Sequence, residues 1–231
     1  MLQQLQPQNQ TPIVYPDSDG QPMSDNTLQF QWIVTIKENL ELLFADNSNV
    51  FVAGDLLWYP VEGNNTIRRA PDTMVVFGRP KGYRGSYKQW QEDNIPPQVV
   101  FEILSPGNRI KEMAAKLQFY QQYGVEEYYL YDPEKVDFAG WQKIDGQLTI
   151  IDEIQGWVSP RLGVRFEMAQ ELQIFTPTGE RFLTFVELGQ IKQKMEQELQ
   201  QERRRAEQAE ARLKELEERL KSLGVDPNLS E

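Results

Sequence analysis

The sequence predicts an α/β fold followed by a C-terminal coiled-coil helix. Three observations support this prediction. Short apolar runs of strand length alternate with helical patterns through most of the chain. A strand–helix–strand succession over residues 98–131 is typical of a crossover connection in an α/β domain. Between residues 182 and 223 there is no proline, and Leu and Ala recur at heptad spacing among many charged residues.

The composition excludes several kinds of active site. The 231 residues include no Cys and no His, so disulfides, thiolate metal sites, Ser-His-Asp triads and imidazole bases are impossible. Acid–base chemistry must therefore use carboxylates, Lys, Tyr or water on a metal ion. No apolar run approaches the length of a membrane span, and the N-terminal residues do not resemble a signal peptide. We therefore expect a cytoplasmic protein without a membrane partner.

The chain divides into four parts. Residues 1–24 are polar with several prolines and predict an extended arm, residues 25–179 form the main domain, residues 180–224 form the coiled-coil helix, and residues 225–231 are a tail. Self-association through the helix, as a homodimer, is the expected consequence of its apolar seam. The seam consists of Leu199, Ala206, Ala209, Leu213, Leu216, Leu220 and Leu223, interrupted by Glu202.

The first elements of the main domain follow from local patterns. A helix begins after Asp25 or Asn26, either of which can cap it. The apolar stripe predicted for this helix is Leu28, Trp32, Ile36, Leu40 and Leu43. Strands are expected over residues 50–59, with a break at Gly54-Asp55, and over residues 66–77, with turn residues 62–65 between them.

The strand–helix–strand unit follows a long loop over residues 78–96. A strand over residues 98–104 leads into a helix that starts near Asn108 and ends at Gly124. The inward stripe predicted for this helix is Ile110, Met113, Ala114, Leu117 and Tyr120. A strand over residues 127–131 follows, then a hairpin of residues 138–143 and 147–151 joined through Asp145-Gly146, and Trp157 and Phe166 are expected in the core.

The loop over residues 79–88 contains Arg79, Lys81, Arg84 and Lys88 and no acid. Two interpretations are open: a solvated loop, or a loop that contacts phosphates beside an acidic site. The net charge of −11 argues against a broad nucleic-acid surface on the protein as a whole.

Two carboxylates stand out because they lie in apolar, strand-like runs. Asp72 opens the run APDTMVVF, and Glu102 lies inside PPQVVFEIL. Burying a carboxylate is costly unless it is paired or binds a cation. If the two strands are neighbours, both side chains can converge on one hard cation such as Mg²⁺. The alternatives are that Asp72 shapes a turn and that Glu102 pairs with Arg109.

The ordered motifs around these acids resemble the Uma-two family of restriction-endonuclease-like proteins, within the PD-(D/E)xK nuclease superfamily. The resemblance runs from about residue 28 to residue 177. It rests on the elements Ala70-Pro71-Asp72, Phe101-Glu102-Ile103-Leu104-Ser105-Pro106, Lys116-Leu117-Gln118-Phe119-Tyr120 and Gly124-Val125-Glu126-Glu127-Tyr128-Tyr129. The resemblance implies a restriction-endonuclease-like core with a mixed central β-sheet flanked by helices.

The resemblance also implies a metal-dependent site. Asp72 and Glu102 match the two acids, which would bind Mg²⁺ or Mn²⁺ and act in catalysis. The superfamily lysine usually lies two residues after the second acid, where this chain has Leu104. Lys116 is the candidate replacement, because a lysine beside an apolar helical stripe either extends its amine to solvent or has a function there. Gln98 lies where the family often has an acid, while Asp55 is a weaker candidate and Tyr120 is expected in the core.

The function predicted from these residues is hydrolysis of DNA phosphodiester bonds by a metal-dependent endonuclease, with DNA as the partner. The alternative is a nuclease-like fold with weak or absent activity that serves as a binding or scaffolding module through its coiled coil. The missing lysine at position 104 and the net charge of −11 favour the alternative. The ordered set of two acids and a lysine favours the enzyme.

Overall fold

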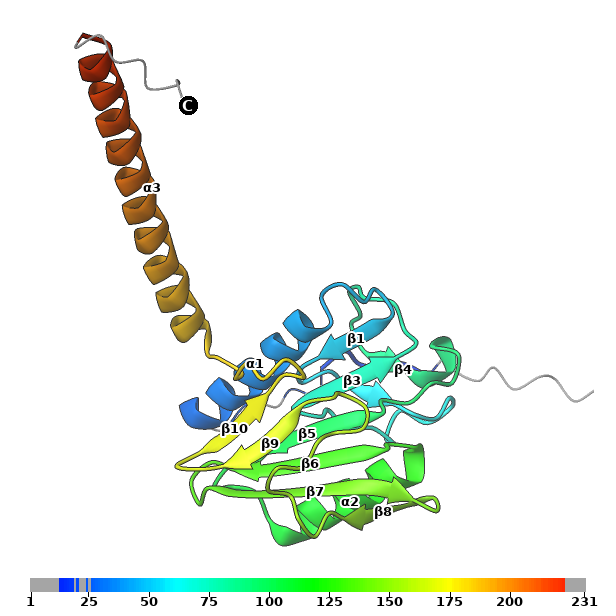
Figure 1. Ribbon diagram of the computed structural model, residues 1–231. Helices are drawn as coiled ribbons and strands as arrows, with labels where there is room; N and C mark the ends of the chain where they lie inside the picture. Colours follow the sequence, from blue (N-terminus) through cyan, green and yellow to red (C-terminus); the bar gives the residue numbers. More distant parts are fainter. Residues whose placement is uncertain (1–12, 19, 21–23, 25, 223–231) are drawn as a thin grey trace, which may run out of the picture. The chain divides into compact units, whose positions relative to one another are not determined.

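The computed structural model describes residues 13–18, 20, 24 and 26–222 (Figure 1). The chain separates into a compact unit that ends at Phe182 and a second unit that starts at Leu183. Most of the predicted arm and the whole of the predicted tail over residues 225–231 lie outside the described residues, as does Asp25.

The centre of the first unit is a six-stranded mixed sheet in the order β1-β3-β5-β6-β7-β8. Only β5 and β6 are parallel, and the other neighbours are antiparallel. The prediction of an α/β core with a mixed central sheet is thus confirmed. The strands are β1 (Val50–Ala53), β3 (Thr73–Phe77), β5 (Val99–Ile103), β6 (Glu127–Asp132), β7 (Asp137–Ile144) and β8 (Gln147–Ile150).

Two small strand pairs accompany this sheet. The strands β9 (Arg165–Met168) and β10 (Leu172–Phe175) are antiparallel, and β2 (Trp58–Tyr59) runs parallel to β4 (Tyr87–Lys88), which precedes a 3-10 turn at Gln89–Gln91. The predicted break at Gly54-Asp55 is present, and Asp55 adopts a left-handed φ of 46°. The chain leaves the main sheet at this break, so only the first half of residues 50–59 pairs with β3.

Helix α1 (Thr27–Leu43) begins at the Asn26 cap, whose side chain accepts a hydrogen bond of 2.8 Å from the amide of Gln29. Its predicted stripe is rotated. Leu28 is exposed, and the residues that α1 buries are Gln29, Ile33, Ile36, Asn39 and Leu40. The sequence pattern missed this face because it contains two amide side chains, which resemble surface residues.

Helix α2 (Ile110–Tyr123) provides the crossover between the parallel strands β5 and β6. Gly124 ends it in the left-handed conformation, with φ of 101°, as predicted. The predicted inward stripe was wrong at its first position, since Ile110 is 91% exposed. Phe119 and Tyr120 are the residues of α2 that are buried.

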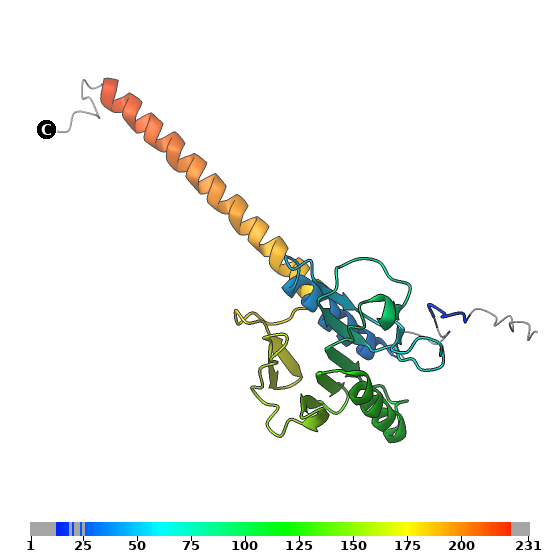
Figure 2. The ribbon, with the colours of Figure 1, turned by 90° about the vertical axis from the view of Figure 1, so that its right-hand side faces the viewer.

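The strand residues alternate between two hydrophobic cores, one on each face of the sheet. One core packs Ile33, Ile36 and Leu40 of α1, together with Phe166, Leu172 and Ile174 of the β9–β10 pair, against the sheet. The other core packs Phe119 and Tyr120 of α2 against the opposite face. Figure 2 shows the β9–β10 pair and α2 on opposite sides of the sheet. The expected core positions of Phe166 and Trp157 are confirmed, Trp157 being partly buried.

The described part of the arm contacts the first unit. Tyr15 packs edge-on against Tyr59, with ring centroids 5.2 Å apart. The hydroxyl of Tyr59 donates to the carbonyl of Pro16 at 2.7 Å, and the hydroxyl of Ser86 donates to Asp17 at 3.0 Å. Residues 13–17 are therefore held along the β2–β4 side of the unit.

Helix α3 (Phe185–Ser222) forms the second unit and starts with a reciprocal cap. The amide of Thr184 donates to Glu187 at 2.8 Å, and the amide of Glu187 donates to the Thr184 hydroxyl at 3.3 Å. The apolar side chains of α3 are exposed within the described chain. Leu223, the last residue of the predicted seam, lies outside the described residues. In the described part of the chain, no helix is both long enough and apolar enough to span a bilayer.

Candidate active site

The register between β3 and β5 brings Asp72 and Glu102 together. Thr73 pairs with Phe101 in this antiparallel ladder, and continuing the register by one residue places Asp72 opposite Glu102. Directly opposed residues in an antiparallel pair have side chains on the same face, with Cβ atoms about 4.5–5.5 Å apart. The predicted neighbourhood of the two acids is therefore present at one end of these strands.

Glu102 lies on the face that α2 covers, and two side chains of that helix bind it. The ammonium of Lys116 lies 2.8 Å from Glu102 Oε2, and the hydroxyl of Tyr120 donates to Glu102 Oε1. Glu102 is only 2% exposed. The structure therefore pairs Glu102 with Lys116 and Tyr120, and not with Arg109 as in the alternative interpretation. Lys116 reaches the acid because it lies one turn before Tyr120 on the inward side of α2.

Asp72 is buried beside this cluster. Its Oδ2 accepts a hydrogen bond of 2.6 Å from the amide of Ile103, the residue after Glu102. Burial and the negative charge of Glu102 raise the pKa of Asp72 well above its ordinary value, against the lowering effects of the Ile103 amide and Lys116. The charge of Asp55 adds a smaller increase. The two acids thus form a site in which negative charge is concentrated and incompletely balanced.

The ammonium of Lys116 balances part of this charge. Burial alone would lower the pKa of Lys116, but the charge of Glu102, its hydrogen bond and the charge of Asp72 outweigh burial, and the pKa is raised. Lys116 is therefore a cation at neutral pH. It can donate hydrogen bonds and stabilise negative charge, but it cannot act as a base.

Sequence reasoning missed three groups around the site. Tyr120 was assigned to the core alone, yet its hydroxyl holds Glu102. The Nε2 of Gln29 in α1 donates to the carbonyl of Ile103 at 2.8 Å and fixes the end of β5 from the other face. The hydroxyl of Tyr128 is buried and has no hydrogen-bond partner in the described structure. Burial raises the pKa of Tyr128, and the negative charges of Glu102 and Asp72 raise it further.

The donor set fits a divalent cation of the Mg²⁺ type. Mg²⁺ takes one or two carboxylates and keeps several waters, and Asp72 and Glu102 offer two carboxylates whose mutual repulsion a cation would relieve. Each carboxylate oxygen has two lone pairs, so the hydrogen bonds from Lys116, Tyr120 and Ile103 leave acceptor capacity. Among the described residues, no group of three or more acidic side chains could hold a metal ion. Asp72 and Glu102 would thus be the residues that hold the ion, with water as the remaining ligands.

The basic loop over residues 79–88 is largely neutralised within the protein. Arg79 pairs with Glu92 at 2.8 Å and also with Asp93, and Arg84 pairs with Glu92 at 2.6 Å. Lys81 pairs with Glu41 of α1 at 2.8 Å. These ion pairs are typical of a structural loop. They leave fewer uncompensated positive charges to bind phosphates than the sequence suggested.

A second buried carboxylate has a different environment. Glu127 on β6 is 1% exposed and accepts hydrogen bonds from the hydroxyls of Ser159 and Tyr129 and from the amide of Arg161, the last at 2.8 Å. Burial raises its pKa, and these donors oppose the increase. Glu127 therefore ties the segment before β9 to the sheet.

Comparisons with known proteins identify similar chains. The family model Uma2, described as "Putative restriction endonuclease", matches residues 8–173. A crystal structure of "a putative nuclease belonging to DUF820" from Anabaena variabilis ATCC 29413 is 13% identical, with a TM-score of 0.44, over 58% of this chain and 72% of that chain. No curated protein matches the sequence.

The mixed sheet with its crossover helix makes this an α/β protein, and the family whose model it matches is described as a putative restriction endonuclease. The family match covers most of the chain. This protein belongs to the Uma2 family, and the resemblance noted from the sequence motifs is confirmed.

Proposed function

We propose that this protein is a divalent-metal-dependent endonuclease that hydrolyses DNA phosphodiester bonds, with Asp72 and Glu102 as metal ligands and Lys116 as the third catalytic group. The observation that carries the proposal is the buried cluster in which Asp72 lies opposite Glu102 and the Lys116 ammonium lies 2.8 Å from Glu102. Family membership supports the class of reaction, and Mg²⁺ or Mn²⁺ suits the oxygen donors. The cytoplasmic location expected from the sequence is part of the same proposal.

Each group of the cluster has a separate task. When bound, a divalent cation lowers the pKa of a coordinated water and offsets charge on the phosphoryl group. Lys116 holds a positive charge next to Glu102, where it can donate a hydrogen bond to the attacking water or to a phosphate oxygen. Tyr120 is a positioning residue, because its hydroxyl fixes the orientation of Glu102. Gln29 and the Ile103 amide hold the backbone and Asp72 in register.

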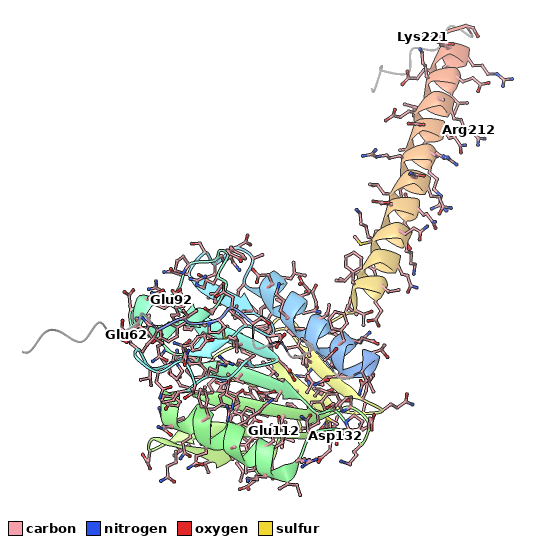
Figure 3. The ribbon with its side chains drawn as sticks, turned by 180° about the vertical axis from the view of Figure 1, so that it is seen from behind. Glu62, Glu92, Glu112, Asp132, Arg212 and Lys221 are labelled. Atoms are coloured by element: carbon pink, nitrogen blue, oxygen red, sulfur yellow. The ribbon has the colours of Figure 1, made fainter. Side chains whose placement is uncertain are left out.

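The start of α2 is a better candidate for contacting DNA than the loop over residues 79–88. Arg109 and Lys111 are exposed and lie close in sequence to the site residues of β5 and α2. Figure 3 shows the neighbouring Glu112 on α2, whose side chain is also exposed. Arg79, Lys81 and Arg84 are already paired with acids. We therefore assign phosphate contacts to Arg109 and Lys111 in this proposal.

The test is cleavage of supercoiled plasmid and of single-stranded DNA with Mg²⁺ or Mn²⁺. We expect the wild type to cut and Glu102→Gln to lose activity by about 10²-fold or more, because a metal ligand and its charge are removed. Glu127→Gln is the matched control, since both acids are buried and both changes are nearly isosteric. Glu127→Gln is expected to lower stability and leave the activity of the folded fraction unchanged. Equal loss in both variants would contradict the assignment of Glu102.

The second candidate function is a nuclease-like binding or scaffolding module. Its specific support is that Lys116 and Tyr120 engage both oxygens of Glu102, which are contacts that can also hold a buried carboxylate in a purely structural role. Titration with Mn²⁺ separates the two functions. Binding that depends on Asp72 and Glu102 supports the enzyme, and the absence of both binding and cleavage supports the scaffold.

A further inference from the structure

The exposed leucines of α3, with Met195, lie at the a and d positions of one heptad frame, while Val186 and Ile191 lie outside these positions. In this frame the d positions are Leu188, Met195, Glu202, Ala209 and Leu216, and the a positions are Lys192, Leu199, Ala206, Leu213 and Leu220. Leu199, Leu213 and Leu216 are 54%, 60% and 52% exposed in the described structure. A seam of this kind on a 38-residue helix is stabilised when another helix covers it.

The charges beside the seam show which partner fits. The g positions are Glu198, Arg205, Arg212 and Arg219, and the e positions are Glu196, Arg203, Glu210 and Glu217. In a parallel pair, each g residue faces the e residue five positions later on the partner helix. Two copies of this chain would then pair Glu198 with Arg203, Arg205 with Glu210, and Arg212 with Glu217. Every one of these contacts is attractive.

An antiparallel pair is disfavoured by the same residues. Antiparallel helices bring g beside g and e beside e. When Leu199 is set opposite Leu216, Arg205 lies beside Arg212 and Glu196 beside Glu217, whereas Glu198 lies beside Arg219 and Arg203 beside Glu210. Half of these contacts are repulsive, while all three g–e contacts of the parallel pair are attractive. Like charges at such positions are destabilising.

The first charge pair also fixes the register. Glu198 and Arg203 have the opposite polarity to the two pairs that follow. A shift of one heptad in a parallel pair therefore places Glu198 beside Glu210, or Arg205 beside Arg203. Only the in-register pair has no repulsive contact between g and e positions, and in it Lys192 and Glu202 each face their own copy across the seam.

We infer that α3 binds α3 of a second copy of this chain as a parallel, in-register coiled-coil dimer. The occupant of the seam is thus the same segment of the same protein, chosen by charge complementarity along the helix. This inference concerns the second unit and does not depend on the proposed nuclease activity.

The chain offers a charge-swap test of this inference by light scattering on the full-length protein. The wild type is expected at twice the chain mass of 26.9 kDa. The variant R205E/R212E places Glu beside Glu210 and Glu217, so its mass should fall towards that of one chain. The variant R205E/R212E/E210R/E217R has the wild-type composition and should return to the dimer mass. An antiparallel pair would not respond to R205E/R212E, because residues 205 and 212 face each other there and repel whether both are Arg or both are Glu, so an unchanged dimer mass in that variant would contradict the parallel pair.

Because the chain has no Cys, single substitutions give a second, direct readout of orientation. Leu216→Cys lies at d and should form a disulfide-linked dimer on oxidation. Ala211→Cys lies at f on the outer side of the helix and is the matched control, which should remain uncrosslinked. A linked product formed only when Leu199→Cys and Leu216→Cys proteins are mixed would overturn the parallel orientation. A wild type with the mass of one chain would overturn the dimer.

Discussion

Asp72 is a proposed metal ligand whose burial also destabilises the fold at neutral pH. Its carboxylate is buried against Glu102, and burial and that charge raise its pKa above the ordinary value of 3.8. The folded protein therefore binds this proton more tightly than the unfolded chain does. The stability that the proton provides is present below about pH 4 and is lost as the pH rises through the raised pKa of the folded state.

This linkage gives a prediction for Asp72→Asn, which retains an oxygen for the Ile103 amide. Without metal ions at pH 7, the variant should be more stable than the wild type by about 1 kcal/mol, or roughly 2–4 °C in Tm. The difference should shrink as the pH falls towards 4, where Asp72 is protonated in the folded wild type. Added Mg²⁺ should raise the Tm of the wild type and not that of the variant.

The exposed Asp152→Asn is the matched control and should show none of these effects. Thermal unfolding followed by circular dichroism at several pH values provides the measurement. A large, pH-independent loss of stability in Asp72→Asn would identify Asp72 as a structural turn residue and remove it from the metal site.

Two buried glutamates illustrate what a residue type alone cannot decide. Glu102 and Glu127 are both almost fully buried and lie on neighbouring strands. Glu127 accepts hydrogen bonds from three donors, and burial raises its pKa. Glu102 raises the pKa of a second acid, Asp72. These partners distinguish Glu127, whose environment is that of a structural carboxylate, from Glu102, the proposed metal ligand.

At the scale of elements, the loop over residues 79–88 is best understood through its ion pairs. Arg84 is held by Glu92 at 2.6 Å, and its guanidinium lies 4.0 Å from the centroid of the Phe51 ring. Its side chain is 12% exposed. A partly buried arginine with an acid and an aromatic ring contributes packing as well as charge.

We therefore predict that Arg84→Ala destabilises the fold by about 1–3 kcal/mol, because Glu92 loses a charged partner and Phe51 loses a cation–π contact. Urea unfolding measures this change. The exposed Lys111→Ala serves as the control and should leave stability unchanged while weakening DNA binding. Arg84→Ala with unchanged stability and lost DNA binding would restore the phosphate-contacting interpretation of the loop.

Helix α2 shows what the sequence can and cannot predict about an element. Its sequence predicts both ends correctly, but the apolar spacing alone assigned Ile110 to the inward face, where the structure leaves it exposed. The orientation of α2 is set by Phe119 and Tyr120, which pack against Trp58 at centroid distances of 5.3 and 6.4 Å. These aromatic contacts turn Lys116 towards Glu102.

At the scale of the whole molecule, the two units separate the proposed chemistry from the proposed assembly. The first unit ends at Phe182 and contains both cores and the acid–lysine cluster. We predict that deleting residues 190–231 leaves a core with unchanged near-UV circular dichroism and a Tm within a few degrees of the full chain. Its mass by light scattering should be that of one chain. A deletion variant that remains dimeric would show that the first unit also associates.

The sequence by itself predicted the three helices, the strands of the central sheet, and the two acids and one lysine of the candidate site, but it did not predict β4, β9 or β10. Local patterns were sufficient because periodicity, caps and turn residues act over a few positions. The Asn26 cap, the end at Gly124 and the turn at Asp145-Gly146 all follow from neighbouring residues. The ordered motifs also identified the family.

Only the tertiary structure decided which partners these residues have. Lys116 meets Glu102 across 14 positions, and Gln29 meets the Ile103 carbonyl across 74. Such contacts depend on strand register and on how a helix is rotated against the sheet, and packing on both sides of the sheet fixes these quantities. For the same reason, only the structure shows that Arg79 and Arg84 pair with Glu92 and that Lys81 pairs with Glu41, whereas the sequence showed only their positive charge.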